Sequence, residues 1–176
     1  IMDYNIKKKI TTEYSYDNIN TLLLCMAIER STDTHIANYL ENKVWQKAGM
    51  SHDATWSVDS KENKQVKGFC GINAAPIDLV RFGSIYLHNG FYNGKQIVPK
   101  NWVEESFTKY NKPKDENGHY YSYSWRITNK NAYVAVGIMG QYVYIDPNKN
   151  IVVVRTGESY DNFDWIKFIE TMTSYL

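Results

Sequence analysis

The chain has 176 residues, of which 43% are hydrophobic and 22% charged, a composition typical of one soluble globular domain with a real core. Lysine and arginine number 20 against 19 aspartates and glutamates, so the net charge of +1 gives no reason to expect a nucleic-acid partner. No apolar run approaches the ~20 residues that a transmembrane helix needs, and we predict no membrane span in this chain. The 4 histidines and 2 cysteines show no metal-binding spacing, so we expect neither a metal ion nor a cofactor.

The first residues do not have the pattern of a signal peptide, because Lys7, Lys8 and Lys9 are followed by polar residues rather than by an apolar stretch. Ile1 precedes Met2, and we therefore expect a further segment upstream. No internal repeat or low-complexity linker divides the sequence. We predict a single partial domain over residues 1–176, mostly helical to about residue 115 and built of strands and one helix over about 116–176.

Hydrophobic periodicity predicts helices in the first part of the chain. The first spans residues 18–30, with Asn18 or Asn20 as its N-cap. The second spans about 34–47 and stops at Gly49, and the third begins at Pro76. A capping box formed by Asn101 and Glu104 predicts a short fourth helix. A tight turn is expected at residues 93–94, where asparagine precedes glycine.

The second part of the chain is rich in β-branched and aromatic residues, which favour strands. We predict strands at residues 121–128, 132–137, 140–145 and 151–156, with a turn at 146–150, and a last helix over about 161–175. The connections are too short for helical crossovers, so the strands form an antiparallel meander. Helices followed by antiparallel strands and a closing helix indicate an α+β fold.

Several stretches resemble, in family order, the serine β-lactamase-like (penicillin-binding-protein) superfamily, in its branch of class C β-lactamases, esterases and nylon-oligomer hydrolases. The resemblance rests on Tyr16-Asp17-Asn18, on the segment ending in Gly49-Met50, on Asp78-Leu79-Val80-Arg81-Phe82-Gly83, on residues 90–102, on Tyr121-Ser122-Tyr123-Ser124-Trp125 and on Gly137-Ile138-Met139-Gly140-Gln141. It covers about residues 14–155 and implies the C-terminal portion of that fold. The Ser-x-x-Lys motif, which carries the nucleophile in this superfamily, is absent from its expected place before Tyr16.

The run Tyr16-Asp17-Asn18 matches the second active-site motif of the family. The resemblance gives Tyr16 the role of general base and proton shuttle, because a phenol with an ordinary pKa of about 10 can act as a base when a nearby lysine stabilises the phenolate. It gives Asn18 the role of orienting that lysine or the substrate. The alternatives are a surface tyrosine and an N-cap. Asp78 and Arg81 are interpreted as a helix start and a surface pair.

The third motif, usually Lys-Thr-Gly or His-x-Gly, falls on Ile138-Met139-Gly140. Gly140 leaves room for substrate to approach the strand, and the backbone N–H of Gln141 becomes one oxyanion-hole donor. Ile138 and Met139 would contact substrate, but Ile138 cannot bind the carboxylate of a β-lactam. The alternative for Gly140 is a strand bulge.

Two further patterns each have a functional and a structural interpretation. Tyr121, Tyr123 and Trp125 alternate, so on one strand they would share a face and form either a wall of the acyl pocket or a face packed under a helix. Ser106-Phe107-Thr108-Lys109 satisfies Ser-x-x-Lys, but it follows Tyr16 and coincides with a predicted helix. We interpret it as a chance match.

The sequence therefore favours part of a serine hydrolase that cleaves small esters, amides or peptides through an acyl-enzyme and is inactive without a segment bearing Ser-x-x-Lys. The alternatives are a non-catalytic binding or sensor domain on the same scaffold and, less favoured, an aromatic-rich carbohydrate-binding module. The family resemblance implies a periplasmic or extracellular location, although no residue of this chain specifies one.

Overall fold

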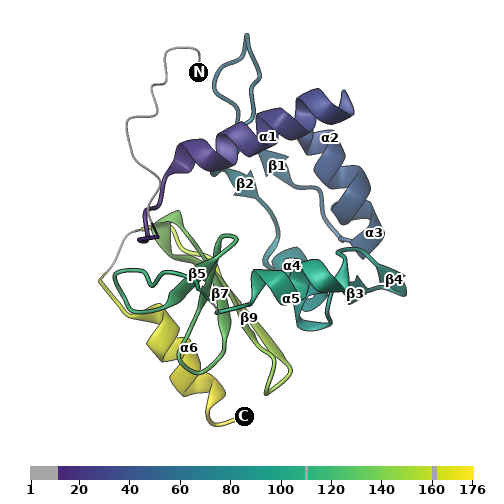
Figure 1. The fold of residues 1–176 in the computed structure, drawn as a ribbon. Helices are drawn as coiled ribbons and strands as arrows, with labels where there is room; N and C mark the ends of the chain where they lie inside the picture. Colours follow the sequence, from purple (N-terminus) through teal and green to yellow (C-terminus); the bar gives the residue numbers. More distant parts are fainter. Residues whose placement is uncertain (1–11, 110, 160–161) are drawn as a thin grey trace.

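The computed structural model describes residues 12–109, 111–159 and 162–176. A five-stranded sheet forms one half of the fold, with strands in the order β5-β6-β7-β8-β9 and every neighbouring pair antiparallel (Figure 1). The strands are β5 (Tyr120–Ser122), β6 (Trp125–Ile127), β7 (Tyr133–Gly137), β8 (Gln141–Asp146) and β9 (Ile151–Arg155). The predicted meander and the α+β class are confirmed.

The segment predicted as one strand over residues 121–128 is a hairpin. β5 and β6 pair through Ser122 and Trp125, and the two residues between them, Tyr123 and Ser124, have φ of 45° and 70°. A two-residue turn with positive φ at both positions matches the right-handed twist of paired strands. The sequence lacks the Asn-Gly that usually announces such a turn, and the prediction of one continuous strand was therefore wrong.

Helices cover both faces of the sheet. On one face α6 (Trp165–Thr173) packs Ile169 against Val134 and Tyr144. On the other face α4 (Pro76–Leu87) packs against a core that contains Trp125 and Val143, and Figure 1 shows α4 and α6 on opposite sides of the strands. A Cβ at Gly83 would lie 2.6 Å from Val152 Cγ1, so the glycine lets α4 approach the sheet closely. These helices fix the sheet between two apolar layers.

The other half of the fold is helical. α1 (Asn18–Thr32) is followed by α2 (Ile36–Leu40), a π-helical turn (Glu41–Trp45) and α3 (Gln46–Ala48). Gly49 ends this run in the left-handed conformation with φ of 65°, as predicted. A two-stranded pair, β1 (Thr55–Trp56) and β2 (Ile72–Asn73), lies beside these helices (Figure 1). A second small core of Cys25, Ile36 and Val66 joins this half together.

Two helix caps differ from the predictions. The N-cap of α1 is Asp17, whose carboxylate accepts a hydrogen bond from Ile19 N at 3.1 Å, and not Asn18 or Asn20. α5 (Lys100–Ser106) follows Pro99 and has no side-chain cap, so the predicted capping box is wrong. α6 is capped by Asp164, and its predicted start at residue 161 lies outside the described residues.

The predicted start of the third helix and the predicted tight turn are confirmed. Pro76 opens α4, and the turn between β3 (Phe91–Tyr92) and β4 (Lys95–Gln96) has φ of 49° at Asn93 and 72° at Gly94. Within the described residues, none of the helices has both the length and the apolarity needed to cross a bilayer.

Asp78 joins the helical half to α4. Its side chain has no exposed surface and accepts hydrogen bonds from the backbone N–H groups of Ser51 and His52 and from Arg81 Nη1. The interpretation of Asp78 and Arg81 as a surface pair was therefore wrong, because the carboxylate fixes the loop after Gly49 onto the first turn of α4.

Candidate active site

Tyr16 lies two residues before α1 and is 55% exposed. Its ring meets Tyr121 of β5 edge-on with 6.3 Å between ring centroids, and Tyr14 meets Tyr121 at 5.2 Å. Because Asp17 caps the helix immediately after Tyr16, the phenol is held between a fixed helix start and the first strand of the sheet. The structure thus brings together Tyr16 and Tyr121, two of the predicted site residues.

Asn18 is the first residue of α1 and is exposed. The N-cap alternative for this residue is wrong, since Asp17 makes the capping bond. Asn18 therefore lies at the helix start, two residues after Tyr16, and is exposed to solvent. Its predicted role in orienting a lysine or substrate stays a prediction.

A charged group lies behind the tyrosines. The Arg126 guanidinium carbon lies 5.7 Å from the Tyr121 ring centroid, and Arg126 Nε donates to the Asp115 carboxylate at 2.9 Å. Burial raises the pKa of Tyr121, and a hydrogen bond with Ser124 opposes that rise. Burial likewise raises the pKa of Tyr14. Both phenols therefore remain protonated and neutral at physiological pH.

The predicted third motif forms the turn between β7 and β8, a short 3-10 segment at Ile138–Gly140. Ile138 and Met139 are 57% and 37% exposed, so both present apolar surface at this turn. Met139 has φ of 58° and Gly140 has φ of 80°. A Cβ at Gly140 would lie 2.2 Å from Arg155 Nη1, so a side chain there would displace the guanidinium, a contact that the sequence did not indicate. The positive φ favours glycine at this position.

Side chains from β8 and β9 hold this turn. Arg155 Nη1 donates to the Gly140 carbonyl at 2.5 Å, and the guanidinium carbon lies 3.6 Å from the ring centroid of Trp165. Gln141 Nε2 donates to the Gly157 carbonyl, while Gly157 N donates to Gln141 Oε1 at 3.2 Å. Because its side chain is paired in this way, the role of Gln141 in the predicted oxyanion hole depends on its backbone N–H, and that role stays a prediction.

Strand register places these groups at one end of the sheet. The β5–β6 turn follows Ser122, and the β7–β8 turn follows Gly137. β6 and β7 between them are antiparallel, with Arg126 opposite Val134. Both turns therefore point the same way, although β6 and β7 separate β5 from β8 by three spacings of about 4.8 Å. Among the described residues no hydrogen bond or ring contact joins Tyr16 to the β7–β8 turn. The two parts of the candidate site border one end of the sheet without touching.

The expected aromatic face does not form. Because the hairpin turn falls at Tyr123 and Ser124, Tyr121 and Trp125 lie on different strands and on opposite faces of the sheet. Trp125 is 5% exposed and lies under α4, with its ring 4.9 Å from Tyr86. Tyr123 is 47% exposed and contacts Trp102 at 4.8 Å. The shared-face prediction is wrong, and Trp125 belongs to the core rather than to a substrate wall.

Ser106 does not have the surroundings of a nucleophile. It is 1% exposed, and its Oγ donates to the Trp102 carbonyl within α5 at 2.7 Å. Lys109 Nζ donates instead to the Thr128 carbonyl and to Asn131 Oδ1 at 2.6 Å. Both members of this chance Ser-x-x-Lys are committed to other partners. Throughout the described ranges, histidine, cysteine and acidic side chains form no group of three that could hold a metal ion.

The fold is that of the serine β-lactamase-like proteins. The family model described as Beta-lactamase matches residues 2–160, and the chain belongs to that family.

Relatives point to one branch of the family. The chain is 29% identical over 159 residues to the 6-aminohexanoate-dimer hydrolase of Paenarthrobacter ureafaciens, covering 82% of this chain and 39% of the relative. Among solved structures it is similar to a putative 6-aminohexanoate-dimer hydrolase from Bacillus anthracis, with a TM-score of 0.78, 27% identity and coverage of 93% and 43%. A β-lactamase from Mycobacterium bovis, at 15% identity and a TM-score of 0.69 over 93% of this chain and 65% of that one, shares the fold. The chain thus spans about two fifths of the length of the two hydrolases.

Proposed function

We propose that this chain is part of a serine hydrolase that cleaves small esters, amides or peptides through an acyl-enzyme. In this proposal the chain supplies the second and third motifs, and a further segment supplies the serine and lysine of Ser-x-x-Lys. The observation that carries the proposal is the position of Tyr16, exposed before a capped helix at the end of the sheet toward which the Ile138–Gly140 turn also points. The chain by itself is expected to be inactive.

Tyr16 is the proton carrier in the proposed reaction. The motif lysine stabilises the Tyr16 phenolate, which takes the proton of the serine hydroxyl. At the same time the serine oxygen attacks the substrate carbonyl carbon. The backbone N–H of Gln141 and that of the serine donate to the resulting oxyanion. Collapse of the tetrahedral intermediate breaks the bond between the carbonyl carbon and the leaving nitrogen or oxygen, and the leaving atom receives the proton from Tyr16. Water then gives a proton to the Tyr16 phenolate as the water oxygen attacks the acyl carbon. Cleavage of the bond between the acyl carbon and the serine oxygen releases the carboxylic acid, and Tyr16 returns the proton to the serine oxygen.

Ile138 directs the choice of substrate. An apolar side chain that is 57% exposed, in place of the basic or imidazole residue of the third motif, offers no charge to the carboxylate of a β-lactam. The two hydrolases to which the chain is similar are described as acting on a 6-aminohexanoate dimer. We therefore infer that linear amides and esters are better substrates than β-lactams.

The outer face of α1 supports a segment placed beside Tyr16. This face consists of Asn20, Leu23, Leu24, Ala27 and Ser31, and it carries no charged residue although Leu24 is 63% exposed. The charged residue Glu29 points inward instead and accepts from Ile36 N at 2.9 Å. The other charged residue of the helix, Arg30, is exposed in the last turn, so the uncharged exposed stretch is confined to the turns of α1 nearer Tyr16. An uncharged exposed stretch with apolar residues has the composition of a helix side that another segment covers.

Intact-mass analysis with a fluorophosphonate probe tests the proposal. The complete hydrolase, defined as the gene product that contains this chain together with a Ser-x-x-Lys segment, should gain one probe mass, and the 176-residue chain should gain none. Tyr16→Phe in the complete hydrolase should lower kcat for a p-nitrophenyl ester at least a hundredfold, with little change in KM. An unlabelled complete protein would favour the alternative of a non-catalytic binding domain, and labelling of Ser106 in the 176-residue chain would refute the proposal.

A further inference from the structure

Arg126 is a cation beside the candidate site with an unused hydrogen-bonding edge. It lies on β6 opposite Tyr121 of β5, and its guanidinium carbon is 5.7 Å from the Tyr121 ring centroid. Its Nε donates to the Asp115 carboxylate at 2.9 Å, and its side chain is 14% exposed. Among the described residues neither of its Nη nitrogens has a hydrogen-bond partner. Because an arginine binds a carboxylate through two parallel N–H groups, the Nη pair is free to bind an anion.

Asp115 holds this edge in a fixed position. The Asp115 side chain has no exposed surface, and besides Arg126 it accepts hydrogen bonds from the backbone N–H groups of Asn117 and His119 at 3.0 Å and 2.9 Å. The carboxylate is therefore anchored by the backbone of its own loop, and it orients the guanidinium in turn. A guanidinium that is already oriented loses little conformational freedom when it binds a second anion.

Arg126 is the charged group with the largest effect on the neighbouring phenol of Tyr14. Burial is the main cause of the raised pKa of Tyr14. Among the charged groups Arg126 comes first and lowers this pKa, and its effect exceeds that of either Glu116 or Asp115, which raise the pKa. Glu116 is exposed to solvent, where its charge is screened. Neither carboxylate alone therefore offsets the positive potential of Arg126 beside the tyrosines.

The contacts of Tyr121 link Arg126 to Tyr16. The Tyr121 ring centroid lies 6.3 Å from that of Tyr16 and 5.7 Å from the Arg126 guanidinium carbon. In the proposed function Tyr16 gives its proton to the leaving nitrogen or oxygen, so groups near Tyr16 line the leaving-group side of the substrate. In a leaving group that is a linear amino acid of six carbons, the carboxylate lies about 8 Å from the scissile carbonyl carbon when the chain is extended. This length is on the scale of the two contacts.

We propose that Arg126 is a specificity-determining residue, which binds the carboxylate of a linear amide or ester substrate whose leaving group ends in that carboxylate. The inference rests on the proposed function, because the proton transfer from Tyr16 defines the leaving-group side. Ile138 of the third-motif turn is apolar and offers no charge to an acid, so β6 supplies the cation instead. The preferred substrates are linear amides and esters with a terminal carboxylate rather than uncharged ones.

A matched pair of substrates tests this preference in the complete hydrolase. N-acetyl-6-aminohexanoate and N-acetyl-6-aminohexanamide share the scissile acetamide bond and differ only in the terminal carboxylate. The acid should have a kcat/KM for acetate release at least about tenfold higher than the amide, because a hydrogen bond to a charged group forms only with the acid. The difference should lie mainly in KM, since this contact forms when substrate binds. Equal kcat/KM for the two substrates would overturn the proposal.

The variants remove the cation without leaving a buried charge. Arg126→Gln alone would leave the Asp115 carboxylate buried and unpaired, so the test variant combines Arg126→Gln with Asp115→Asn. Lys112→Gln is the matched control, because Lys112 Nζ lies 4.6 Å from the ring centroid of Tyr123 in the β5–β6 turn. The double variant should lose the preference for the acid while its kcat/KM for the amide changes by less than about threefold, and the control should keep the preference. A preference that persists in the double variant, or that the control loses, would contradict the proposal.

Calorimetric binding to the complete Tyr16→Phe variant separates this inference from the proposed function. N-acetyl-6-aminohexanoate should bind at least about tenfold more tightly than the amide, and equal affinities would refute the role of Arg126. A fluorophosphonate-labelled hydrolase that cleaves both substrates equally would retain the proposed function and refute this inference. An unlabelled protein that binds the acid more tightly, and loses that preference in the double variant, would retain Arg126 as an anion-binding residue and refute the function.

Discussion

The carboxylate of Asp78 receives four hydrogen bonds, from Ser51 N at 2.7 Å, His52 N at 3.0 Å, His52 Nδ1 at 3.1 Å and Arg81 Nη1 at 2.5 Å. Burial alone would raise the pKa of this group, but the bonds from Ser51, Arg81 and His52 outweigh it and hold the pKa at about 2. Each bond requires the ionised form or is strengthened by it. The carboxylate is therefore part of the framework, although it resembles a surface helix-start residue in sequence.

Asp78 should make the protein sensitive to acid. Its pKa is lower in the folded state, about 2 against an ordinary 3.8, so its contribution to stability is complete above about pH 4 and is lost as pH falls toward 2. Asp78→Asn should destabilise the protein by about 3 kcal/mol at pH 7, because Arg81 loses its buried partner. Urea unfolding of both proteins from pH 2 to pH 7 measures this, and the variant should show a shallower decline below pH 4. A parallel decline in the two proteins would contradict the assignment.

Tyr144 should contribute to the loss of stability of the folded protein at alkaline pH. Burial, followed by the nearby carboxylates of Asp146 and Glu170, raises its pKa to about 12. A phenol whose pKa is raised on folding stabilises the protein fully below pH 10, and this contribution declines as pH rises from 10 to 12. Tyr144→Phe should therefore lose less stability than the wild type over that interval, measured by thermal unfolding at pH 8 to 11. Tyr92→Phe, which changes a tyrosine outside the sheet core, is the control and should leave the slope unchanged.

At the scale of elements, local sequence signals predicted most of the fold. Pro76, Gly49 and the Asn93-Gly94 pair act through their own backbone preferences, which neighbours do not alter, and all three mark the boundaries that the structure has. The hairpin at Tyr123 and Ser124 was missed because its positive φ values are imposed by the pairing of β5 and β6 rather than by residue type. The alternation of aromatic residues continues across this turn, so the sequence pattern gives no sign of it.

The candidate site was predictable to a smaller extent. Tyr16 and Gly140 could be found because each belongs to a short motif. Arg155 could not, since it follows Gly140 by 15 residues and its contact depends on the register of β8 with β9. The predicted wall of alternating aromatics failed for the same reason, because one turn moved Trp125 to the opposite face. Contacts made across strands require the register, which the sequence pattern does not contain.

Gly140 offers a test of how the third-motif turn is held. Gly140→Ala combines a left-handed backbone with a Cβ that would lie 2.2 Å from Arg155 Nη1, whereas Gly94→Ala has a similar φ and open space around its Cβ. The control should therefore lose about 1 kcal/mol for backbone strain alone, and Gly140→Ala should lose clearly more because Arg155 must also move. Chemical unfolding gives both values. Equal losses of unfolding free energy in the two variants would show that the Arg155 side chain moves aside without destabilising the protein.

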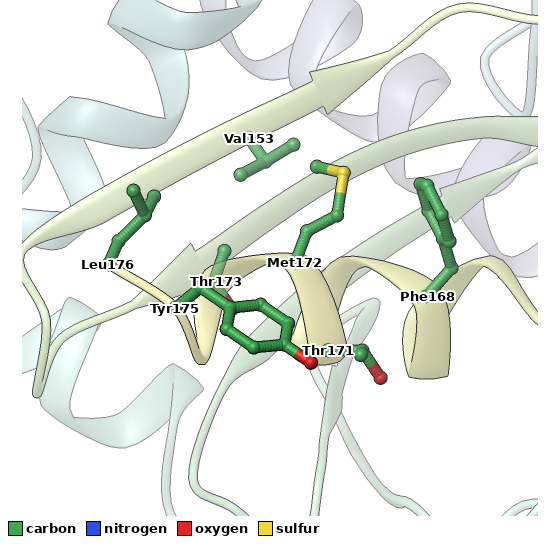
Figure 2. A pocket seen from close by; sticks show the side chains of 7 residues that line it. All are labelled: Val153, Phe168, Thr171, Met172, Thr173, Tyr175 and Leu176. Atoms are coloured by element: carbon green, nitrogen blue, oxygen red, sulfur yellow. The ribbon is translucent and has the colours of Figure 1, made fainter.

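At the scale of the whole molecule, the described residues form three hydrophobic clusters, one in the helical half and one on each face of the sheet. The helical core centres on Cys25 and Ile36, and the sheet carries the others. Exposed apolar side chains occur on both halves of the fold, among them Leu24 on α1 and Phe168 and Met172 on α6 (Figure 2). Where such side chains are contiguous, they are typical of a site of contact with another polypeptide.

The outer face of α1 gives the last prediction. Leu24, 63% exposed, lies two turns of helix from Tyr16, and Phe91 is 51% exposed on β3 outside this face. In the 176-residue chain Leu24→Glu and Phe91→Glu should each change the unfolding free energy by less than about 0.5 kcal/mol, since both side chains face solvent. In the complete hydrolase Leu24→Glu should cost about 2 kcal/mol or more, because an unpaired carboxylate would then be buried against the segment that brings the nucleophile to Tyr16, and Phe91→Glu should not. Thermal unfolding of the four proteins, together with fluorophosphonate labelling rates, measures both effects. If Leu24→Glu leaves the stability and the labelling rate of the complete hydrolase unchanged, the nucleophile reaches Tyr16 from another direction.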